Sequence, residues 1–538
     1  MLKLSKAGIK DGAAWAKAGI GLPRFDLEAM AAKTEAAPAW VHFGAGNIFR
    51  GYPALLQQRL LEQGKADTGI VAVETYDFEI IDRFYKPYDN LGLLVIMNAD
   101  GSLDNTVVAS VSEALVGDPS RTADWARLEA IFKSPSLRMA SFTITEKGYS
   151  LSAMSGDYLP DVAADIENGP RQPRNVMGKV AALAYVRYQA GRLPIAFVSM
   201  DNCSHNGEKL GSAVVTIAKA WADKGLVDGG FLDYLNDPAK VSFPWSMIDK
   251  ITPRPSDSVK EMLGAAGFVS TEIVCTAKNT YIAPFVNAEG PQYLVIEDHF
   301  PAGRLPLELA GVYFTDRQTV DRVEKMKVCT CLNPLHTSLA VFGCLLGQKS
   351  IADEMKDADL KKLVEKIGYE EGLPVVVNPG ILDPRDFIRE VIEVRLPNPY
   401  IPDTPQRIAC DTSQKLSIRF GETIKAYRDS AGRDPKSLKY IPLVLAAWCR
   451  YLMAVDDAGQ PMTLSPDPLL ATLTPYLADV KLGDGPAAAG KLSPILKNDR
   501  LFGTDLYAVG LGEKVEGYFA EMIAGKGAVR ATLHKTLG

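Results

Sequence analysis

The chain has 538 residues, of which 47% are hydrophobic and 23% charged, and its formal net charge is -6. This composition predicts a globular protein of two or more domains, and the acidic balance argues against a general nucleic-acid-binding protein. No apolar run approaches the roughly 20 residues of a membrane span, and the N-terminus lacks the apolar core of a signal peptide. Seven cysteines in so long a chain do not form a disulfide framework, so we expect a cytoplasmic protein.

The cysteines and histidines do not show the spacing of metal ligands. Cys329 and Cys331 are one residue apart, the five histidines are scattered, and no HExxH sequence occurs. Zinc sites normally use two-residue cysteine spacing or paired histidines on one helix. We therefore expect no metal site.

A strand, a glycine turn, a helix and a second strand follow a helical arm or loop over residues 1–37. The strand covers residues 39–43, the helical apolar spacing covers 52–62, and the second strand covers 69–74. This order is a βαβ unit. Further strands are predicted over 92–97, 106–111, 138–145 and 194–199, and a helix over 176–189. The alternation predicts a mainly parallel α/β sheet.

Beyond residue 316 long helical patterns dominate the sequence. They cover residues 334–346, 351–368, 384–395, 438–455 and 513–525, with loops predicted over 396–405 and 482–490. We therefore predict an α/β domain over residues 1–242 and a mostly helical domain over 243–538. Two strands near 274–297 belong to the second stretch by sequence but can pack on the first domain.

The turn after the first strand carries a dinucleotide-binding signal, Gly44-x-Gly46. There the backbone can approach a pyrophosphate, and the following helix supplies N–H groups and a positive dipole. Phe49 stands where the third glycine of the motif is expected, and a methyltransferase glycine loop looks similar. The candidate cofactor contacts in this turn are Gly44, Gly46, Asn47, Ile48, Phe49 and Arg50. Arg50 could reach a phosphate or form a salt bridge.

Glu74 ends the second strand of the βαβ unit. A carboxylate there can accept hydrogen bonds from the adenosine ribose and would repel a 2′-phosphate, which favours NAD over NADP. The alternative is a surface acid at the end of a strand.

The run Glu324–His336 brings Lys327, Asn333 and His336 together. These are the groups that a metal-free enzyme would use to protonate a carbonyl as hydride arrives. The apolar neighbours of Lys327 predict partial burial, which disfavours its ammonium form and suits it to proton exchange. The competing interpretation is structural, with Asn333 as a helix N-cap and proline at the first helical position.

Polar clusters also occur in other segments. Residues 145–149 and 201–207 follow strand ends, where open α/β sheets bind ligands, although turn formation also explains them. Asp249 lies next to a lysine, which could be a local ion pair. Arg407 and Lys415 could clamp a carboxylate or be ordinary helix-surface charges.

Together these segments resemble the long-chain polyol dehydrogenases, the mannitol dehydrogenase and fructuronate reductase family. The matching segments run in family order from residue 41 to 415 and read VHFGAGNIFRG, TITEKGY, VSMDNCSHNG, SMIDKITP, VIEDHF, EKMKVCTCLNPLH and NPYIPDTPQRIACDTSQK. TITEKGY and VIEDHF look closer to fructuronate reductase than to mannitol dehydrogenase.

The resemblance implies a zinc-independent, NAD-linked enzyme with a Rossmann-type domain, a helical C-terminal domain and an active site between them. By position, Lys327 would be the general acid/base, and Asn202 and Asn333 would contact the reacting oxygen. His336 would orient the substrate, and Glu324 would relay protons to solvent.

The resemblance further implies that Asp249, Arg407 and Lys415 bind substrate hydroxyls or a carboxylate. It favours reduction of a keto-hexuronate, such as D-fructuronate to D-mannonate. Close alternatives are a mannitol-type 2-dehydrogenase and a tagaturonate reductase. Different classes are an S-adenosylmethionine-dependent methyltransferase and a non-catalytic nucleotide-binding protein.

One departure from the family pattern concerns helical phase. The chain has one more residue between Lys327 and Asn333 than the family pattern. At ~100° per residue, the nine steps from Lys327 to His336 place them on roughly opposite faces of a regular helix. The sequence therefore predicts a π-bulge, or a break at Asn333-Pro334. Lys325 is the competing catalytic candidate.

Overall fold

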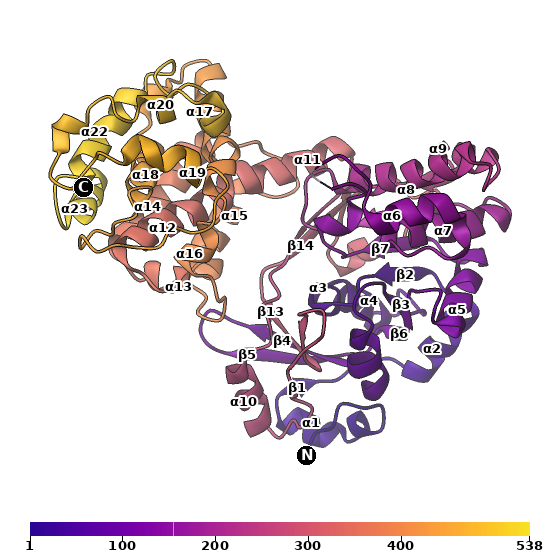
Figure 1. Cartoon of the computed structure of the whole chain (residues 1–538). Coiled ribbons are helices and arrows are strands. Elements are labelled where there is room, and N and C mark those ends of the chain that lie inside the picture. The colour runs from indigo at the N-terminus through magenta and orange to yellow at the C-terminus, as the bar shows by residue number, and fades with distance from the viewer. Residues whose placement is uncertain (154) are drawn as a thin grey trace. The chain divides into compact units, whose positions relative to one another are not determined.

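The computed structural model describes residues 1–153 and 155–538, which form two compact units (Figure 1). The first comprises Met1–Asn98 and Ser102–Asp321, and the second Ala99–Gly101 and Arg322–Gly538. The predicted boundary between residues 242 and 243 therefore lies inside the first unit, and the strands near 274–297 belong to that unit.

A six-stranded parallel sheet forms the centre of the first unit. Its strand order is β6-β3-β2-β7-β8-β9. The strands are β2 (Trp40–Phe43), β3 (Ile70–Glu74), β6 (Val111–Val116), β7 (Met139–Phe142), β8 (Ile195–Ser199) and β9 (Val241–Ser242). Numbered along the chain, this is the 3-2-1-4-5-6 order of dinucleotide-binding sheets, whose switch point lies between β2 and β7. The predicted parallel α/β sheet is confirmed.

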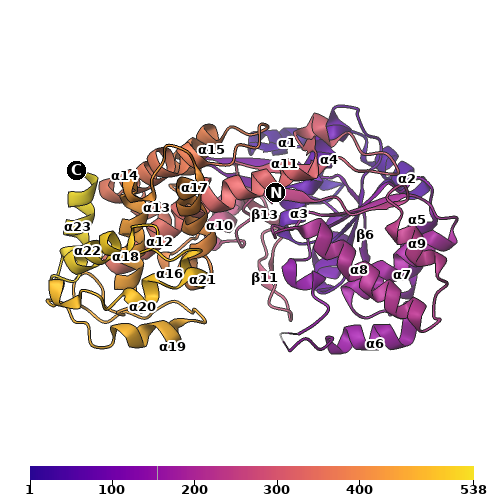
Figure 2. The ribbon, with the colours of Figure 1, turned by 90° about the horizontal axis from the view of Figure 1, so that it is seen from above.

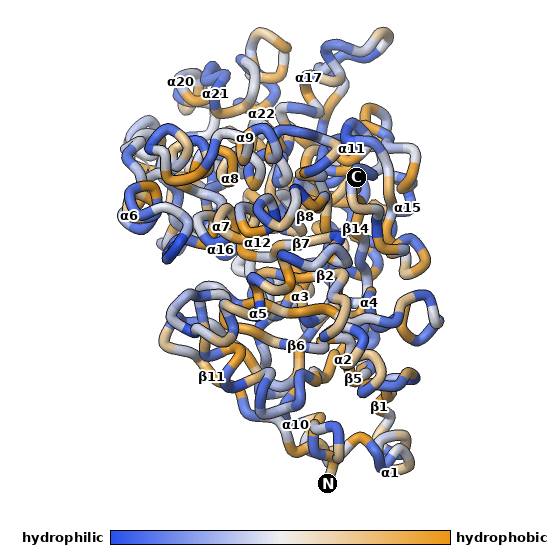
Figure 3. The backbone as a smooth tube through the Cα atoms, turned by 90° about the vertical axis from the view of Figure 1, so that its right-hand side faces the viewer, coloured by the Kyte–Doolittle hydropathy of each residue, from blue (hydrophilic) through white to orange (hydrophobic). Residues whose placement is uncertain are grey.

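Each face of this sheet carries its own core, because successive side chains of a strand point to opposite sides. Val41 and Phe43 pack with α5 (Thr122–Lys133), α7 (Val176–Gln189) and α8 (Asn206–Asp223) on one face. Trp40 packs with α4 (Pro53–Glu62) on the other. Figure 2 shows α7 and α8 beside α9 (Gly230–Asn236), and Figure 3 shows apolar, orange stretches through the unit.

Smaller sheets complete the first unit and explain why it extends past residue 242. A four-stranded sheet has the order β1-β5-β4-β13, so that β13 (Phe285–Glu289) pairs with β4 (Gly92–Met97) from much earlier in the chain. Its other strands are β1 (Ile20–Gly21) and β5 (Leu103–Val108), which begins before the predicted strand over 106–111. A three-stranded sheet contains β10 (Ser246–Asp249), β14 (Tyr293–Glu297) and β15 (Tyr313–Thr315), and β11 (Val274–Cys275) and β12 (Tyr281–Ile282) form a hairpin. The remaining helices are α1 (Gly12–Lys17), α2 (Leu27–Ala36), α3 (Asn47–Gly51), α6 (Pro160–Asn168) and α10 (Asp257–Ala265).

The second unit is helical, as predicted, and is built around α12 (Asn333–Leu346) and α18 (Tyr440–Tyr451). Every residue of α18 is buried. The other long helices are α14 (Ala358–Glu365), α15 (Pro384–Glu390), α17 (Glu422–Asp429), α22 (Gly512–Met522) and α23 (Ala528–Leu537). Shorter helices are α13 (Ile351–Glu354), α16 (Pro405–Ile408), α19 (Leu470–Leu473), α20 (Ser493–Leu496) and α21 (Asp499–Phe502), while α11 (Arg317–Met326) crosses the division between the units.

One continuous helical stretch, Arg317–Leu346, is long and apolar enough by length and composition to cross a membrane. Within its most apolar window, 72% of the residues are buried inside the protein, and its second half packs against α16 and α18. Burial of this kind is typical of a core helix. The expectation of a cytoplasmic protein without a membrane span stays a prediction.

Candidate active site

The glycine turn after β2 can be followed atom by atom. Gly44 has φ 101°, and a side chain there would place its Cβ 2.1 Å from the Thr143 carbonyl oxygen, so both conformation and space require glycine. At Gly46 an added Cβ would meet nothing within 4 Å. The open space beside Gly46 is where a phosphate can approach the backbone.

A buried histidine lies beneath this turn. His42 contacts Ser141 Oγ at 2.6 Å and Thr143 Oγ1 at 2.8 Å, and its ring stacks on Phe49 at 4.2 Å. Burial lowers the pKa of His42 to about 3, so the imidazole is neutral. This contact fixes Phe49 in the core, so Phe49 can meet a cofactor only through its backbone.

Arg50 lies inside the first unit rather than at its surface. Its side chain is buried, and one guanidinium nitrogen donates to the Ala283 carbonyl at 2.8 Å. Burial lowers the pKa of Arg50, while Tyr85 opposes this shift. Asn47 and Ile48 remain partly exposed, and the Asn47 amide donates to the Tyr281 carbonyl at 3.2 Å.

Glu74 is buried, and its carboxylate is bound by backbone N–H groups. Oε1 accepts hydrogen bonds from Thr75, Tyr76 and Asp77, and Oε2 accepts one from Ala45 at 3.0 Å. Desolvation raises the pKa of Glu74, and these four hydrogen bonds oppose that shift. The alternative of an exposed surface acid is therefore wrong, and the carboxylate joins two loops of the sheet edge.

The end of β7 carries a strained turn. Thr145 has φ 65° and ψ 159°, which a β-branched residue rarely adopts. Asp201, after β8, holds this turn by accepting hydrogen bonds from the Ile144 and Thr145 N–H groups and from the Tyr149 hydroxyl. Backbone strain of this kind is typical of functional sites, and it lies at the switch point of the sheet.

Asn202 is exposed directly after Asp201, at the carboxyl end of β8. The nearby Asn206 is buried and donates to the Ser199 and Asp201 carbonyls and to Ser246 Oγ, so it fixes the loop that presents Asn202. Asp249 is the last residue of β10 and is buried.

In the second unit, the run from Lys327 to Cys331 is a π-helical turn. The Leu332 N–H donates to the Lys327 carbonyl at 3.1 Å, which is the i+5 bond of a π-helix. The predicted irregularity is therefore confirmed. Lys327 is 4% exposed, whereas Lys325 is exposed, which favours Lys327 as the proton donor.

The π turn changes the phase between Lys327 and His336. A π-bulge inserts one residue without advancing the helix, so nine steps act as eight. At ~100° per residue, the angle between the two side chains falls from roughly 180° to roughly 80°. The extra residue relative to the family pattern is absorbed in this turn.

Helix capping does not explain Asn333. Leu332 occupies the N-cap position, Asn333 is the first residue of α12, and no side-chain capping bond forms. Thr337 Oγ1 donates to the Asn333 carbonyl at 2.9 Å. The amide of Asn333 is thus available for another role, and Glu324 is partly exposed one turn before Lys327.

His336 faces a carboxylate. Its Nε2 lies 3.3 Å from Asp403 Oδ2, and Asp403 also pairs with Arg407. Burial lowers the pKa of His336 to about 3, with further lowering from Arg419 and Arg407, so the ring is neutral at physiological pH. The Arg407 side chain is 61% exposed, which places its guanidinium at the surface of the second unit.

Two further cations lie on the helical segment after α16. Lys415 donates to the Cys410 carbonyl, and Arg419 donates to Thr337 Oγ1, next to His336 in sequence. Burial lowers the pKa of Arg419 to about 10, and burial followed by the Arg419 charge lowers that of Lys415. Across residues 1–153 and 155–538, Arg419 forms no ion pair with a carboxylate. Arg419 is partly buried, and a partly desolvated guanidinium without an acid is costly and is suited to binding an anion.

Two residues of these sites, Arg419 and Asp403, were not predicted from the sequence, whereas Asp201 belongs to the predicted cluster over residues 201–207. Arg419 follows Lys415 by one helical turn, so it had a local signal. Asp403 had none, because its contact with His336 joins a loop to a helix far away in sequence.

Among the described residues, no group of three His, Cys, Asp or Glu side chains is placed to hold a metal ion. The sites above consist of amides, hydroxyls, carboxylates and cations.

Comparison with known proteins adds the family context. The family model for the mannitol dehydrogenase Rossmann domain matches residues 38–309, and that for the mannitol dehydrogenase C-terminal domain matches 319–511. D-mannonate oxidoreductase of Thermotoga maritima is 57% identical over 539 residues, covering 100% of this chain and 99% of its own. The crystal structure of D-sorbitol dehydrogenase in substrate-free form is 25% identical with TM-score 0.78, covering 95% and 97%. Pseudomonas fluorescens mannitol 2-dehydrogenase in ternary complex with NAD and D-mannitol is 25% identical with TM-score 0.69, covering 99% of both chains.

Proposed function

The chain belongs to the mannitol dehydrogenase family, and we propose that it is an NAD-dependent reductase that interconverts D-fructuronate and D-mannonate. The observation that carries this proposal is the 57% identity over the whole chain to D-mannonate oxidoreductase. Family membership sets aside the methyltransferase alternative for the glycine loop.

The first unit fits a dinucleotide in three respects. It has the sheet order of dinucleotide-binding domains, a glycine at φ 101° after the first strand, and open space beside Gly46. When bound, NADH supplies the hydride for the C5 carbonyl of the keto acid. The backbone of residues 44–48 would hold the pyrophosphate.

Lys327 is proposed to donate the proton that the carbonyl oxygen needs. Its burial and its place at the start of the π turn support this role. The amides of Asn202 and Asn333 are proposed to stabilise the developing negative charge on that oxygen, a preorganised electrostatic contribution. Glu324 is proposed to return the proton from solvent.

His336 is proposed to bind a substrate hydroxyl as a neutral ring. The Asp403 carboxylate lies 3.3 Å from Nε2 without meeting hydrogen-bond geometry, and a neutral imidazole offers one ring nitrogen as a donor and the other as an acceptor. Asp249 is proposed to accept a second substrate hydroxyl.

The cations of the second unit support an acidic substrate. Arg419 is partly buried and pairs with no acid among the described residues, and Lys415 and Arg407 lie in the same segment. A sugar-acid carboxylate would neutralise this charge through charge-assisted hydrogen bonds. A neutral ketose offers no such group.

The proposal is tested by following NADH oxidation with D-fructuronate, D-tagaturonate and D-fructose in parallel. We expect kcat/KM to be highest for fructuronate. Preference for tagaturonate would keep the reductase class and change the epimer, whereas turnover of fructose alone would contradict the proposed substrate class.

A further inference from the structure

A closed set of hydrogen bonds joins three segments of the first unit. Ala45 of the glycine turn donates to Glu74 at 3.0 Å, and Asp77, after β3, accepts from the Thr276 hydroxyl at 2.6 Å. The Asn47 amide donates to the Tyr281 carbonyl at 3.2 Å. This bond links the hairpin back to the glycine turn and closes the set. The β11–β12 hairpin is thereby tied to both loops that border a dinucleotide site.

The hairpin is held rigidly at its tip. Thr276 and Asp77 are both buried, so their hydrogen bond is shielded from water. Thr276 Oγ1 also accepts from the Lys278 and Thr280 N–H groups, and Ala277 donates to Glu79 at 3.0 Å. These bonds fix the backbone from which the Lys278 side chain extends.

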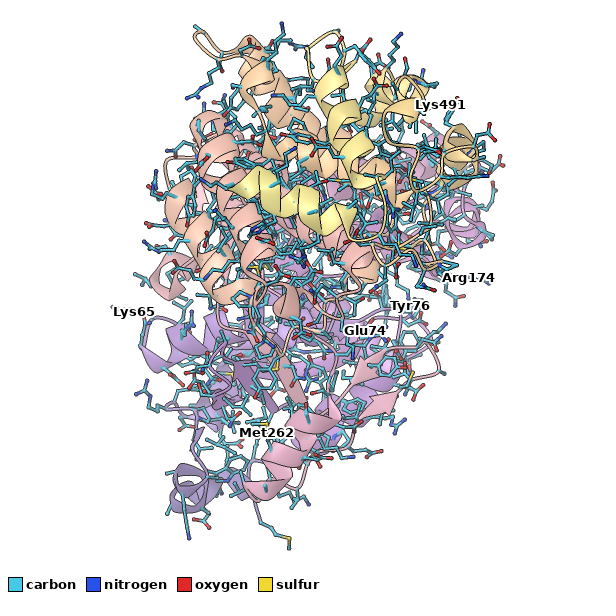
Figure 4. All side chains as sticks on the ribbon, turned by 90° about the vertical axis from the view of Figure 1, so that its left-hand side faces the viewer. Lys65, Glu74, Tyr76, Arg174, Met262 and Lys491 are labelled. Atoms are coloured by element: carbon cyan, nitrogen blue, oxygen red, sulfur yellow. The ribbon has the colours of Figure 1, made fainter. Side chains whose placement is uncertain are left out.

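Lys278 and Tyr76 form a pair at the carboxyl end of β3. The Lys278 Nζ lies 4.9 Å from the centre of the Tyr76 ring, a cation–π distance. Tyr76 is 66% exposed, more than any other aromatic side chain among the described residues. Its backbone N–H donates to Glu74, and Figure 4 labels Glu74 and Tyr76 near each other. The ring is therefore exposed, on a backbone that Glu74 holds in place.

We infer that Tyr76 and Lys278 bind the adenosine end of the cofactor, with the β11–β12 hairpin as its outer wall. In sheets of this order the adenosine lies over the end of the second strand, and here that strand is β3. An exposed ring there offers a stacking surface for adenine, and the ammonium group lies beside it. The inference rests on the proposed use of a nicotinamide dinucleotide.

On this inference Glu74 is a positioning residue, which holds the glycine turn and Tyr76 in place for the cofactor. Four backbone N–H groups already occupy its two oxygens, so its effect on the cofactor passes through the glycine turn and through Tyr76. It does not choose between NAD and NADP by its own charge.

The experiment measures dissociation constants of the full-length enzyme for NADH, by fluorescence titration, and for reduced nicotinamide mononucleotide, which lacks the adenosine, by competition. Tyr76→Ala and Lys278→Ala are each expected to raise the NADH constant roughly tenfold, the scale of one lost base-stacking contact. The mononucleotide constant is expected to change by less than about twofold. Tyr76→Phe, which keeps the ring, should bind NADH as the unmodified enzyme does.

Lys497→Ala is the matched control, because Lys497 also lies over a tyrosine ring, at 5.7 Å, but in the second unit. Unchanged NADH binding in both variants would overturn the inference, and so would equal weakening for NADH and the mononucleotide. Normal NADH binding without fructuronate reduction would overturn the proposed function and leave this binding result standing.

Glu74→Gln separates positioning from charge selection. We expect NADH and NADPH to weaken by the same factor, because the glycine turn loses its anchor for both. A gain of NADPH relative to NADH would show that the carboxylate itself excludes the 2′-phosphate, against the inference.

Discussion

Lys327 combines burial with a place at the start of an irregular helical turn. We predict that Lys327→Ala lowers kcat for fructuronate reduction by at least ~100-fold, the usual effect of losing a general acid/base. Lys325→Ala is the matched control, because that neighbouring lysine is exposed. Steady-state kinetics of both variants decide the assignment, and near-normal turnover in Lys327→Ala would remove this residue from the mechanism.

Arg419 is predicted to determine the preference for sugar acids. Arg419→Met should lower kcat/KM for fructuronate by at least ~10-fold, since hydrogen bonds to charged groups contribute about 1.5–3 kcal/mol. The residual rate with fructose should stay unchanged within about threefold, because fructose has no carboxylate to lose.

Arg419→Lys keeps the charge but not the forked geometry of the guanidinium. Its kcat/KM for fructuronate should lie between those of the unmodified enzyme and Arg419→Met. Arg428→Met serves as the control, because Arg428 is paired with its neighbour Asp429. Equal losses for fructuronate and fructose in Arg419→Met would mean that Arg419 supports the fold rather than the carboxylate.

Glu354 in α13 is buried, and neither of its carboxyl oxygens has a hydrogen-bond partner among the described residues. Burial, and to a smaller extent the nearby Asp357, raises its pKa from 4.5 to about 9. Between pH 4.5 and about pH 9, folding is therefore coupled to uptake of a proton by Glu354. The contribution of Glu354 to the free energy of unfolding is greatest below pH 4.5 and decreases as pH rises towards 9, by ~3 kcal/mol at pH 7.

Glu354→Gln removes this dependence because the amide does not ionise. We predict a stability gain over the unmodified protein that is small at pH 5 and increases up to pH 8, measured by chemical denaturation at each pH. Glu513→Gln, at an exposed position, should show no such trend. A gain that does not change with pH would contradict the assigned proton uptake.

At the scale of elements, the second unit interrupts its helices repeatedly. Besides the turn at Lys327–Cys331, π-helical turns lie at Lys366–Gly372, Val391–Arg395 and Ser417–Gly421. Such turns are rare in proteins and are concentrated at functional sites. Two of them carry Lys327 and Arg419, so they determine which way proposed site residues point.

We predict that the π turn at Lys327 accommodates the one residue that this chain has in excess of the family pattern. Deleting Cys329 should convert it to a regular helix and leave the Lys327–Asn333–His336 arrangement nearly unchanged, so activity should remain within ~10-fold. Deleting Leu335 instead shifts His336 by ~100° relative to Asn333 and should abolish turnover. Kinetics and helical circular dichroism of both deletions test this, and the opposite order of activities would contradict it.

The sequence predicted this π turn because counting the residues from Lys327 to His336 is enough to show that a regular helix would place them on opposite faces. It did not predict the inward turn of Arg50 or the backbone bonding of Glu74. Those outcomes depend on partners such as Ala283 and Ala45, which spacing along one segment does not reveal.

At the scale of the whole molecule, the parallel sheet and the helical second half followed from local periodicity. The division between the units did not, because β13 joins the first unit through pairing with β4. That pairing is a contact between distant segments, and the change of composition near residue 243 pointed elsewhere. The same reason explains why Asp403 was missed.

We propose that this enzyme moves hydride between a nicotinamide and C5 of a six-carbon sugar acid. The most direct measurement is NMR of the product formed from D-fructuronate and NADH deuterated at the transferable position. We expect D-mannonate with one deuterium at C5. A product without deuterium, or deuterium transfer to fructose but not to fructuronate, would contradict it.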